Sequence, residues 1–290
     1  MSSSVPYLLA ILGEGVVPPS TMVCHGDDLG LLRGDGVFDT TRIVTAQDGT
    51  SRIDHLEEHL SRFARSISGV DGPSPDMDSW NHLIEDAARS WRIPGEAALK
   101  LVYTTGREVV PGPPRGFLII VPLSETHKEA REGINVLCLS RGVTSESFAD
   151  APWLLGGVKT LSYAVNVAAL RHAKSQGADD VIFTSTEGYL LEGATSGLVV
   201  EAADGLWTTP TGATGILSSI TVNTVFEAAD DDGVETSTRL MKRDEVLRSQ
   251  GVWLLSSIRG VVPILSIDGH PAPQDDEMTH RLRVWAGFEE

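Results

Sequence analysis

The chain has 290 residues, of which 41% are hydrophobic and 22% are charged, a composition typical of a globular protein with one large or two medium domains. Its 40 acidic and 23 basic side chains give a net charge of −17, which argues against nucleic acid and membrane surfaces as partners. No stretch approaches the roughly 20 apolar residues that a bilayer span needs. The start at Met1 lacks the features of a signal peptide, so we expect a cytoplasmic protein.

The first part of the chain is predicted to combine helices and strands. Apolar side chains at spacings of three and four over residues 53–67 predict an amphipathic helix, with Asp54 at its start. The same spacing over residues 77–91 predicts a second helix. Strand-like runs follow at residues 98–104 and 116–122. We therefore expect a small α/β domain over residues 1–122.

A polar stretch at residues 123–132 is the predicted domain linker, and residues 133–290 are expected to form a larger, β-rich domain with helices outside. Residues 141–157 are rich in Ser, Asp, Pro and Gly and lead directly to Lys159, which suggests the wall of an active site. A helix is predicted from there to about Gly177. Short β-branched runs at residues 181–184 and 198–200 predict strands.

Two histidines one helical turn apart, His55 and His59, raise the possibility of a zinc site. A metalloprotease helix needs Glu directly after the first His, and Leu56 stands there instead. We therefore expect a solvated helix flank and no metal.

Hydroxyl groups gather where residues 212–221 join a predicted strand to a helix that runs to about Ala229. Amide groups at a helix N-terminus can bind phosphate, although Ser and Thr also cap ordinary helices. Ser256 and Ser257, at the end of the apolar run 252–255, could supply further hydroxyls. Neither GxxxxGK[ST] nor a GxGxxG after a strand is present, so the usual support for ATP or dinucleotide binding is missing.

Two single residues could carry chemistry. Lys159 follows Gly156 and Gly157 and precedes a helix, and a lysine in a semi-buried crevice can act as an amine nucleophile, although most lysines are simply solvated. Glu192 follows the apolar run 189–191, where an inward carboxylate needs a cationic partner.

Five blocks in one order connect these pieces, and together the chain resembles the class IV aminotransferase family, or fold-type IV pyridoxal-phosphate enzymes. The blocks are GDGVF (34–38), HLSR (59–62), VKTLSY (158–163), LEGATS (191–196) and TGILSSIT (214–221). The resemblance implies a two-domain α/β (α+β) fold like that of D-amino-acid aminotransferase, and pyridoxal 5′-phosphate (PLP) as cofactor.

The resemblance also implies roles for single residues. Lys159 would form the Schiff base and move the proton at the substrate Cα, while Glu192 would pair with the pyridine nitrogen and keep the ring an electron sink. Arg62 would reach the cofactor phosphate. The other implied cofactor contacts are Tyr163, Ser196, Leu217, Ile220, Thr221, Ser256 and Ser257.

For the substrate, an amino-acid-like small molecule, Arg42 is the candidate carboxylate contact and Arg107 a weaker one. Two positions depart from the family pattern: Gly197 replaces a frequent Asn, and Thr105 stands where the family often has Arg. The second departure leaves the substrate, and hence the reaction, open.

The blocks and the length look most similar to aminodeoxychorismate lyases, which release pyruvate from 4-amino-4-deoxychorismate to give 4-aminobenzoate for folate synthesis. An alternative is an aminotransferase for D-amino acids or branched-chain amino acids. Another is a binding protein that keeps the fold without turnover. Members of the family close their site between two subunits, so the resemblance implies a homodimer.

Overall fold

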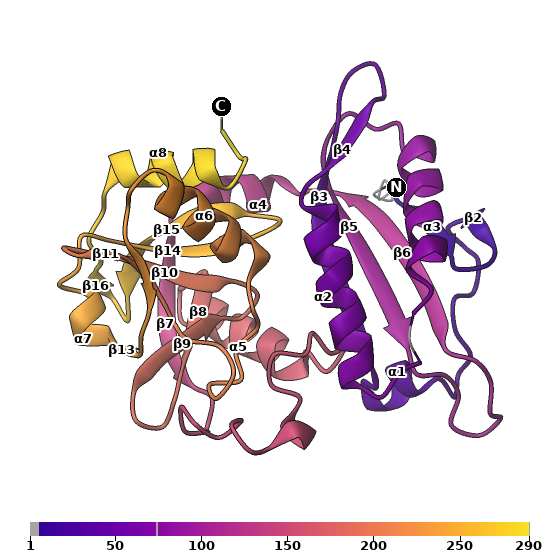
Figure 1. The fold of residues 1–290 in the computed structure, drawn as a ribbon, viewed down its shortest axis with the longest axis horizontal. Helices are drawn as coiled ribbons and strands as arrows, with labels where there is room; N and C mark the ends of the chain where they lie inside the picture. Colours follow the sequence, from indigo (N-terminus) through magenta and orange to yellow (C-terminus); the bar gives the residue numbers. More distant parts are fainter. Residues whose placement is uncertain (1–5, 74, 290) are drawn as a thin grey trace. The chain divides into compact units, whose positions relative to one another are not determined.

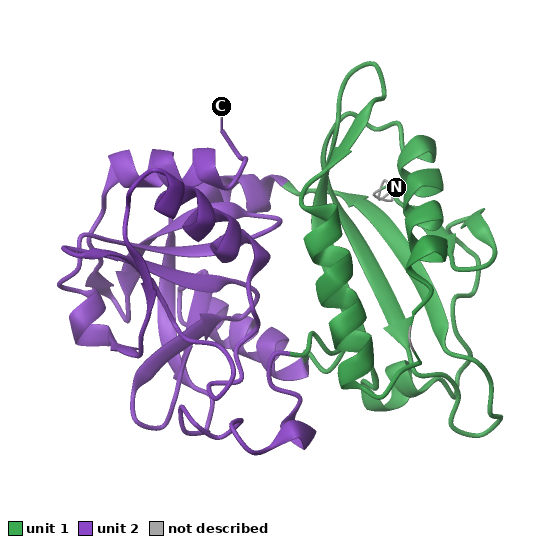
Figure 2. Cartoon of the chain, in the orientation of Figure 1, with its two compact units in different colours: residues 1–124, 158–163 green, residues 125–157, 164–290 purple. Residues whose placement is uncertain are grey.

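The computed structural model describes residues 6–73 and 75–289. The chain divides into two compact units (Figure 2). Unit 1 consists of Met1–Ser124 and Val158–Tyr163, and unit 2 consists of Glu125–Gly157 and Ala164–Glu290. Lys159 therefore belongs to unit 1, although it follows the predicted linker in the sequence.

The described part of unit 1 is built on one six-stranded antiparallel sheet with the order β2-β1-β6-β5-β3-β4 (Figure 1). Its strands are β1 (Leu8–Ile11), β2 (Gly15–Val17), β3 (Gly36–Thr45), β4 (Ser51–Ile53), β5 (Gly95–Thr104) and β6 (Arg115–Pro122). The strands predicted at residues 98–104 and 116–122 lie within β5 and β6, which confirms them.

Helices α2 (Leu56–Gly69) and α3 (Met77–Ser90) pack against this sheet, and a short α1 (Leu29–Arg33) precedes β3. Phe63 of α2 and Trp80 of α3 meet edge to face at 5.0 Å between ring centroids. Both are fully buried with Leu99 of β5 and Leu118 of β6. The apolar spacing predicted for the two helices is thus the face that forms the core of unit 1.

The predicted start of the first helix is wrong. Ile53 ends strand β4, and the helix begins at Leu56 after His55, whose backbone is left-handed and whose side chain makes no capping hydrogen bond. Asp54 does not cap the helix because its carboxylate accepts a 2.6 Å hydrogen bond from Arg42 on β3. A tertiary ion pair therefore replaces the local cap that the sequence suggested.

The described part of unit 2 contains a mixed sheet of ten strands. Its main path runs β12-β11-β10-β14-β15-β7-β8-β9-β13, and β16 pairs with β15. The strands are β7 (Ile134–Ser140), β8 (Asp180–Thr184), β9 (Tyr189–Gly193), β10 (Gly197–Ala202), β11 (Gly205–Thr208), β12 (Thr236–Thr238), β13 (Met241–Lys242), β14 (Gly251–Ser256), β15 (Gly260–Ile267) and β16 (His270–Pro271). Side chains from these strands form most of a central core, as expected for a sheet that curls on itself.

Helices lie outside this core, as predicted for the second half of the chain. Helices α6 and α8 share a second apolar cluster with β10 and β14, and α5 packs on β8. The helical segments are α4 (Glu125–Glu129), η1 (Ala130–Glu132), η2 (Pro152–Leu154), α5 (Ala164–Ser175), α6 (Ile220–Asp231), α7 (Arg243–Val246) and α8 (Asp276–Trp285). Among the described residues, none of the helices combines the length and the apolar character needed to cross a bilayer.

Candidate functional site

The segment that carries Lys159 lies along the start of β3. The Phe38 N–H donates to the Lys159 carbonyl at 3.0 Å, and the Leu161 N–H donates to the Gly36 carbonyl at 2.8 Å. The Lys159 N–H also donates to Ser66 Oγ on α2 at 3.3 Å. Backbone hydrogen bonds to both a strand and a helix therefore fix the position of Lys159 in unit 1.

The Lys159 amine is half-buried among aromatic groups of the same unit. Its Nζ donates to the Tyr163 hydroxyl at 3.3 Å and lies 4.7 Å from the centroid of the Phe38 ring. Phe38 and Tyr163 pack edge to face at 4.9 Å. The structure thus brings together two of the predicted residues, Lys159 and Tyr163, and adds Phe38 from the GDGVF block.

Two glycines of that block are needed because neighbouring segments pass so close. A Cβ on Gly34, whose φ is +71°, would collide with the side chain of Ser162. A Cβ on Gly36 would collide with the Tyr103 carbonyl oxygen and with Leu161. Gly34 therefore lets the Lys159 segment pass close to the chain just before β3, and Gly36 lets β3 approach both that segment and β5.

Arg62 lies on α2 in a buried cluster with Asp39 of β3. Its Nε and Nη2 donate to the two Asp39 carboxylate oxygens at 2.8 Å each, and His59 Nδ1 lies 2.7 Å from Asp39 Oδ1. Ser66, which binds the Lys159 backbone, is one helical turn beyond Arg62 on the same helix face. His59 is only 1% exposed, so the prediction of a solvated flank is wrong for this residue.

The cluster has a defined charge state. Burial alone would raise the pKa of the Asp39 carboxyl, but hydrogen bonds and charge from Arg62 and His59 outweigh it and hold that pKa well below its usual range. Burial also lowers the pKa of His59, against the opposing effect of Asp39. The imidazole is therefore neutral near pH 7, and its Nδ1–H donates to the carboxylate. Asp39 and Arg62 together carry no net charge.

The two arginines predicted to contact substrate each have acidic partners in unit 1. Arg42 is 4% exposed and donates to Asp54, with Glu96 at 3.6 Å. Arg107 donates from Nε to Asp27 at 2.8 Å. Their contact with a substrate carboxylate stays a prediction.

In unit 2, Glu192 lies on β9 with a side chain that is 15% exposed. Its Oε1 accepts a hydrogen bond from Arg141 at 3.2 Å, and its Oε2 accepts one from the Leu217 N–H at 3.1 Å. Arg141 also lies over the Phe148 ring, at 5.7 Å from its centroid. Two predicted residues, Glu192 and Leu217, are thus in direct contact.

The N-terminus of α6 and the turn between β14 and β15 meet in the same unit. Thr221 Oγ1 and Ser257 Oγ are 3.4 Å apart. Ser219 caps α6 by accepting from the Val222 N–H at 3.3 Å, and the first amides of a helix lack acceptors within the helix. Hydroxyl and amide donors therefore gather at the positive end of a helix dipole, an arrangement that suits an anion.

The two remaining predicted serines both bind Arg259, which lies in this turn. Ser196 Oγ accepts from Arg259 Nη2 at 2.8 Å, and the same nitrogen donates to Asp180 at 2.5 Å. Ser256 Oγ accepts from the Arg259 N–H at 3.3 Å. Arg259 thus connects both serines to strand β8.

No motif in the sequence points to Asp39, Arg141 or Arg259 as residues of the site. Asp39 directly follows the GDGVF block, and its position was the only local signal for it. Arg141 opens the irregular stretch 141–157, but its partner Glu192 is 51 residues away. Among the described residues, no group of three or more His, Cys, Asp or Glu side chains is arranged to hold a metal ion.

Comparisons with known proteins cover almost the whole chain. Residues 36–267 match the model of the amino-transferase class IV family. A Mycobacterium tuberculosis protein named bifunctional aminodeoxychorismate lyase / D-amino acid transaminase is 35% identical over 277 residues, which cover 92% of this chain and 93% of that protein.

Two solved structures are similar over the same extent. A hypothetical aminotransferase from M. tuberculosis in a PLP-bound form has a TM-score of 0.90 and 34% identity, with 97% of this chain and 98% of that chain covered. A fold IV transaminase from Curtobacterium pusillum has a TM-score of 0.89 and 34% identity, with 97% of each chain covered. These matches confirm the resemblance drawn from the sequence and the predicted fold class.

Proposed function

Because this chain belongs to the class IV aminotransferase family, whose members use PLP, we propose that it is a 4-amino-4-deoxychorismate lyase that releases 4-aminobenzoate and pyruvate. The observation that carries the proposal is the 35% identity, over nearly the full length of both chains, with a relative whose name includes this activity. The five sequence blocks support the same assignment.

The residues present fit the proposed cofactor. In unit 1, the Lys159 amine, placed by backbone hydrogen bonds and by Tyr163, would hold the aldehyde as an imine. In unit 2, neutral groups that can donate hydrogen bonds to a phosphate are Thr221, Ser257 and the first amides of α6. Arg62 would add a charge-assisted contact to that phosphate. Ser196 and Ser256, which both bind Arg259, are proposed to complete this set of phosphate contacts.

Each polar residue would then have one task. When bound, PLP would supply an electron sink for the electron pair that remains on the substrate Cα after its proton is removed. Lys159 would take that proton with its amine. Glu192 would keep the ring nitrogen protonated, and the Leu217 N–H and Arg141 would hold the Glu192 carboxylate in place. Tyr163 would hydrogen-bond to the phenolic oxygen.

A second candidate function is transamination of D-amino acids. The same M. tuberculosis relative carries both names, so one chain of this family is described with both activities. The two reactions share Lys159 and Glu192 and differ afterwards: the lyase eliminates pyruvate without a second keto acid, whereas the transaminase passes the amino group to one. Arg42 and Arg107 remain candidates for the substrate carboxylate contact.

Activity assays separate these functions. Purified protein is incubated with 4-amino-4-deoxychorismate alone and, separately, with D-alanine plus 2-oxoglutarate. Aminobenzoate formed without a keto acid supports the lyase, and glutamate supports the transaminase. If both mixtures stay unchanged while PLP is bound, the chain is a binding protein and both enzyme proposals fail.

A homodimer is the second part of the proposal. Leu31 and Leu32 of α1 and Val109 and Val110 of the loop between β5 and β6 are each at least half exposed. An ion pair of 2.6 Å between Arg33 and Glu108 joins these two segments. Exposed apolar side chains on neighbouring segments suit a protein interface. Light scattering that gives the 31.1 kDa of one chain would contradict a dimer.

A further inference from the structure

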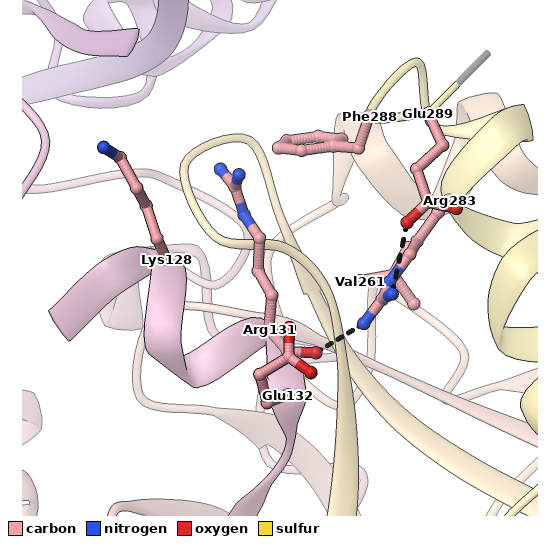
Figure 3. A pocket seen from close by; sticks show the side chains of 7 residues that line it. All are labelled: Lys128, Arg131, Glu132, Val261, Arg283, Phe288 and Glu289. Carbon is pink, nitrogen blue, oxygen red and sulfur yellow. Dashed lines mark hydrogen bonds and ion pairs between the residues drawn. The ribbon is translucent and has the colours of Figure 1, made fainter. Parts of the chain in front are cut away.

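A pocket of about 250 Å³ in unit 2 lies between the η1 turn and the C-terminal residues (Figure 3). Its lining residues are Lys128, Arg131, Glu132, Val261, Arg283, Phe288 and Glu289. The volume is below the range of usual ligand sites, and several of the charged groups are paired with protein atoms. The contacts between the lining residues are therefore of more interest than the pocket as a ligand site.

Arg131 of η1 contacts the turn between β14 and β15. Its Nε donates to the Arg259 carbonyl at 3.0 Å, and its Nη2 donates to the Ile258 carbonyl at 3.2 Å. These carbonyls directly follow Ser257, which lies 3.4 Å from Thr221 at the start of α6. One guanidinium thus fixes the backbone beside a proposed phosphate ligand through two hydrogen bonds.

The C-terminal residues hold Arg131 in turn. The Phe288 ring lies against its guanidinium, with 5.0 Å from Cζ to the ring centroid. Arg283 of α8 donates from Nη2 to the Arg131 carbonyl at 2.5 Å and from Nη1 to Glu289 at 3.2 Å. His280 Nδ1 lies 2.7 Å from the second oxygen of Glu289. Figure 3 shows Arg131 extending toward Phe288.

Phe288 also touches the turn itself. Gly260 has a φ of +74°, and a Cβ there would lie 2.7 Å from Phe288 Cδ1, so the ring packs directly on the backbone of this glycine. On the other side, Arg259 binds Asp180 and Ser196. The turn that carries Ser257 is therefore held by Arg131 and Phe288 on one side and by β8 on the other.

We propose that Arg131 and Phe288 are positioning residues for the phosphate of PLP. They fix the β14–β15 turn so that Ser257 stays beside Thr221 and both hydroxyls can donate to the same phosphate. The proposal rests on the proposed function, because it takes the Thr221 and Ser257 pair as the phosphate site. The C-terminal segment would thus support cofactor binding through the turn that it contacts.

The test compares Phe288→Ala and Arg131→Met with the wild-type chain. Phe288→Leu and Arg131→Lys are the conservative rescues. Arg239→Met is a matched control, because Arg239 also stacks on an aromatic ring, at 3.4 Å from the Trp207 centroid, and pairs with Glu245, but contacts no residue of the turn in these interactions. Each protein is freed of cofactor and titrated with PLP and with pyridoxal, which lacks the phosphate.

Phe288→Ala and Arg131→Met are expected to weaken PLP binding about tenfold, the scale of one lost hydrogen bond to a charged group, and to leave pyridoxal binding within about twofold. The ³¹P resonance of bound PLP should shift in both, and the rescues should return part of the affinity. Equal losses for PLP and pyridoxal, or losses matched by Arg239→Met, would show a merely structural role and overturn the proposal. If the wild-type chain binds no PLP, the proposed function itself fails.

Discussion

Asp39 in unit 1 and Glu192 in unit 2 are both acidic residues beside an arginine, but their surroundings differ. Asp39 is 1% exposed and receives hydrogen bonds from Arg62 and His59. Glu192 keeps 15% of its side chain exposed and receives hydrogen bonds from Arg141 and a backbone amide. The Asp39 carboxylate therefore mainly stabilises its own unit, whereas the Glu192 carboxylate can contact a bound group.

A second contrast concerns the donors offered to a phosphate. The guanidinium of Arg62 in unit 1 is already neutralised by Asp39. In unit 2, Thr221, Ser257 and the amides of α6 are neutral donors. Phosphate binding by this chain would therefore depend on the oriented neutral donors of unit 2 together with the charge-assisted contact proposed for Arg62.

The largest effect is expected from Glu192→Gln. The amide keeps the shape of the side chain but cannot hold a proton on the ring nitrogen, so turnover should fall about 100-fold or more, the scale of one preorganised electrostatic contact. The urea midpoint should change little, because Glu192 is not fully buried. Steady-state kinetics and urea unfolding check both parts, and a fully active variant would break the comparison.

Asp39→Asn should lower the stability of the fold, which Glu192→Gln should leave nearly unchanged. It leaves the buried charge of Arg62 without its partner, so the free energy of unfolding should fall by about 3–5 kcal/mol. The control is the double variant Asp39→Asn with Arg62→Met, which removes the charge as well and should recover part of the loss. Urea unfolding of both variants measures the effect. An unchanged midpoint for Asp39→Asn would mean that the cluster does not stabilise unit 1.

Glu201 on β10 is a buried carboxyl that, unlike Asp39 and Glu192, leaves one oxygen, Oε2, without a hydrogen-bond partner among residues 6–73 and 75–289. Burial, and then the charge of Asp275, raise its pKa from 4.5 to about 7. Between these values the unfolded chain has lost the proton that the folded chain keeps, so stability falls as the pH rises from 4.5 to 7.

The Glu201→Gln variant removes this dependence. At pH 8 it should melt roughly 2–4 °C or more above the wild-type chain, the shift that 1 kcal/mol produces in a chain of this size, and the gap should close toward pH 5. Thermal unfolding from pH 5 to 8 measures it, with Glu227→Gln on the exposed side of α6 as control. A constant gap, or an equal gap in the control, would contradict a protonated Glu201.

The sequence predicted those features whose causes are local. The apolar spacing over residues 77–91 located α3, and the hydroxyl-rich segment 212–221 located the start of α6. The start of α2 was missed because Asp54 pairs with Arg42, 12 residues earlier, instead of capping the helix. His59 was placed in solvent because its partner Asp39 lies 20 residues away on another element.

For the candidate site, too, residues with distant partners could not be predicted from the sequence. The five blocks identified the family and, through it, Lys159 and Glu192, but not the residues that hold them. Arg141 is 51 residues from Glu192, and Arg131 is 128 residues from the Arg259 carbonyl that it binds. Such pairs follow from the tertiary fold, so neither periodicity nor a short motif could indicate them. Among these missed residues, Asp39 directly follows a recognised block, GDGVF.

We propose that Lys159 holds PLP covalently, and peptide masses can show this. The purified protein is reduced with borohydride and digested, and the mass of every lysine-containing peptide is measured. We expect one phosphopyridoxyl group, located on Lys159 and absent from the Lys159→Ala variant. A wild-type chain without cofactor mass, or with the group on another lysine, would contradict it.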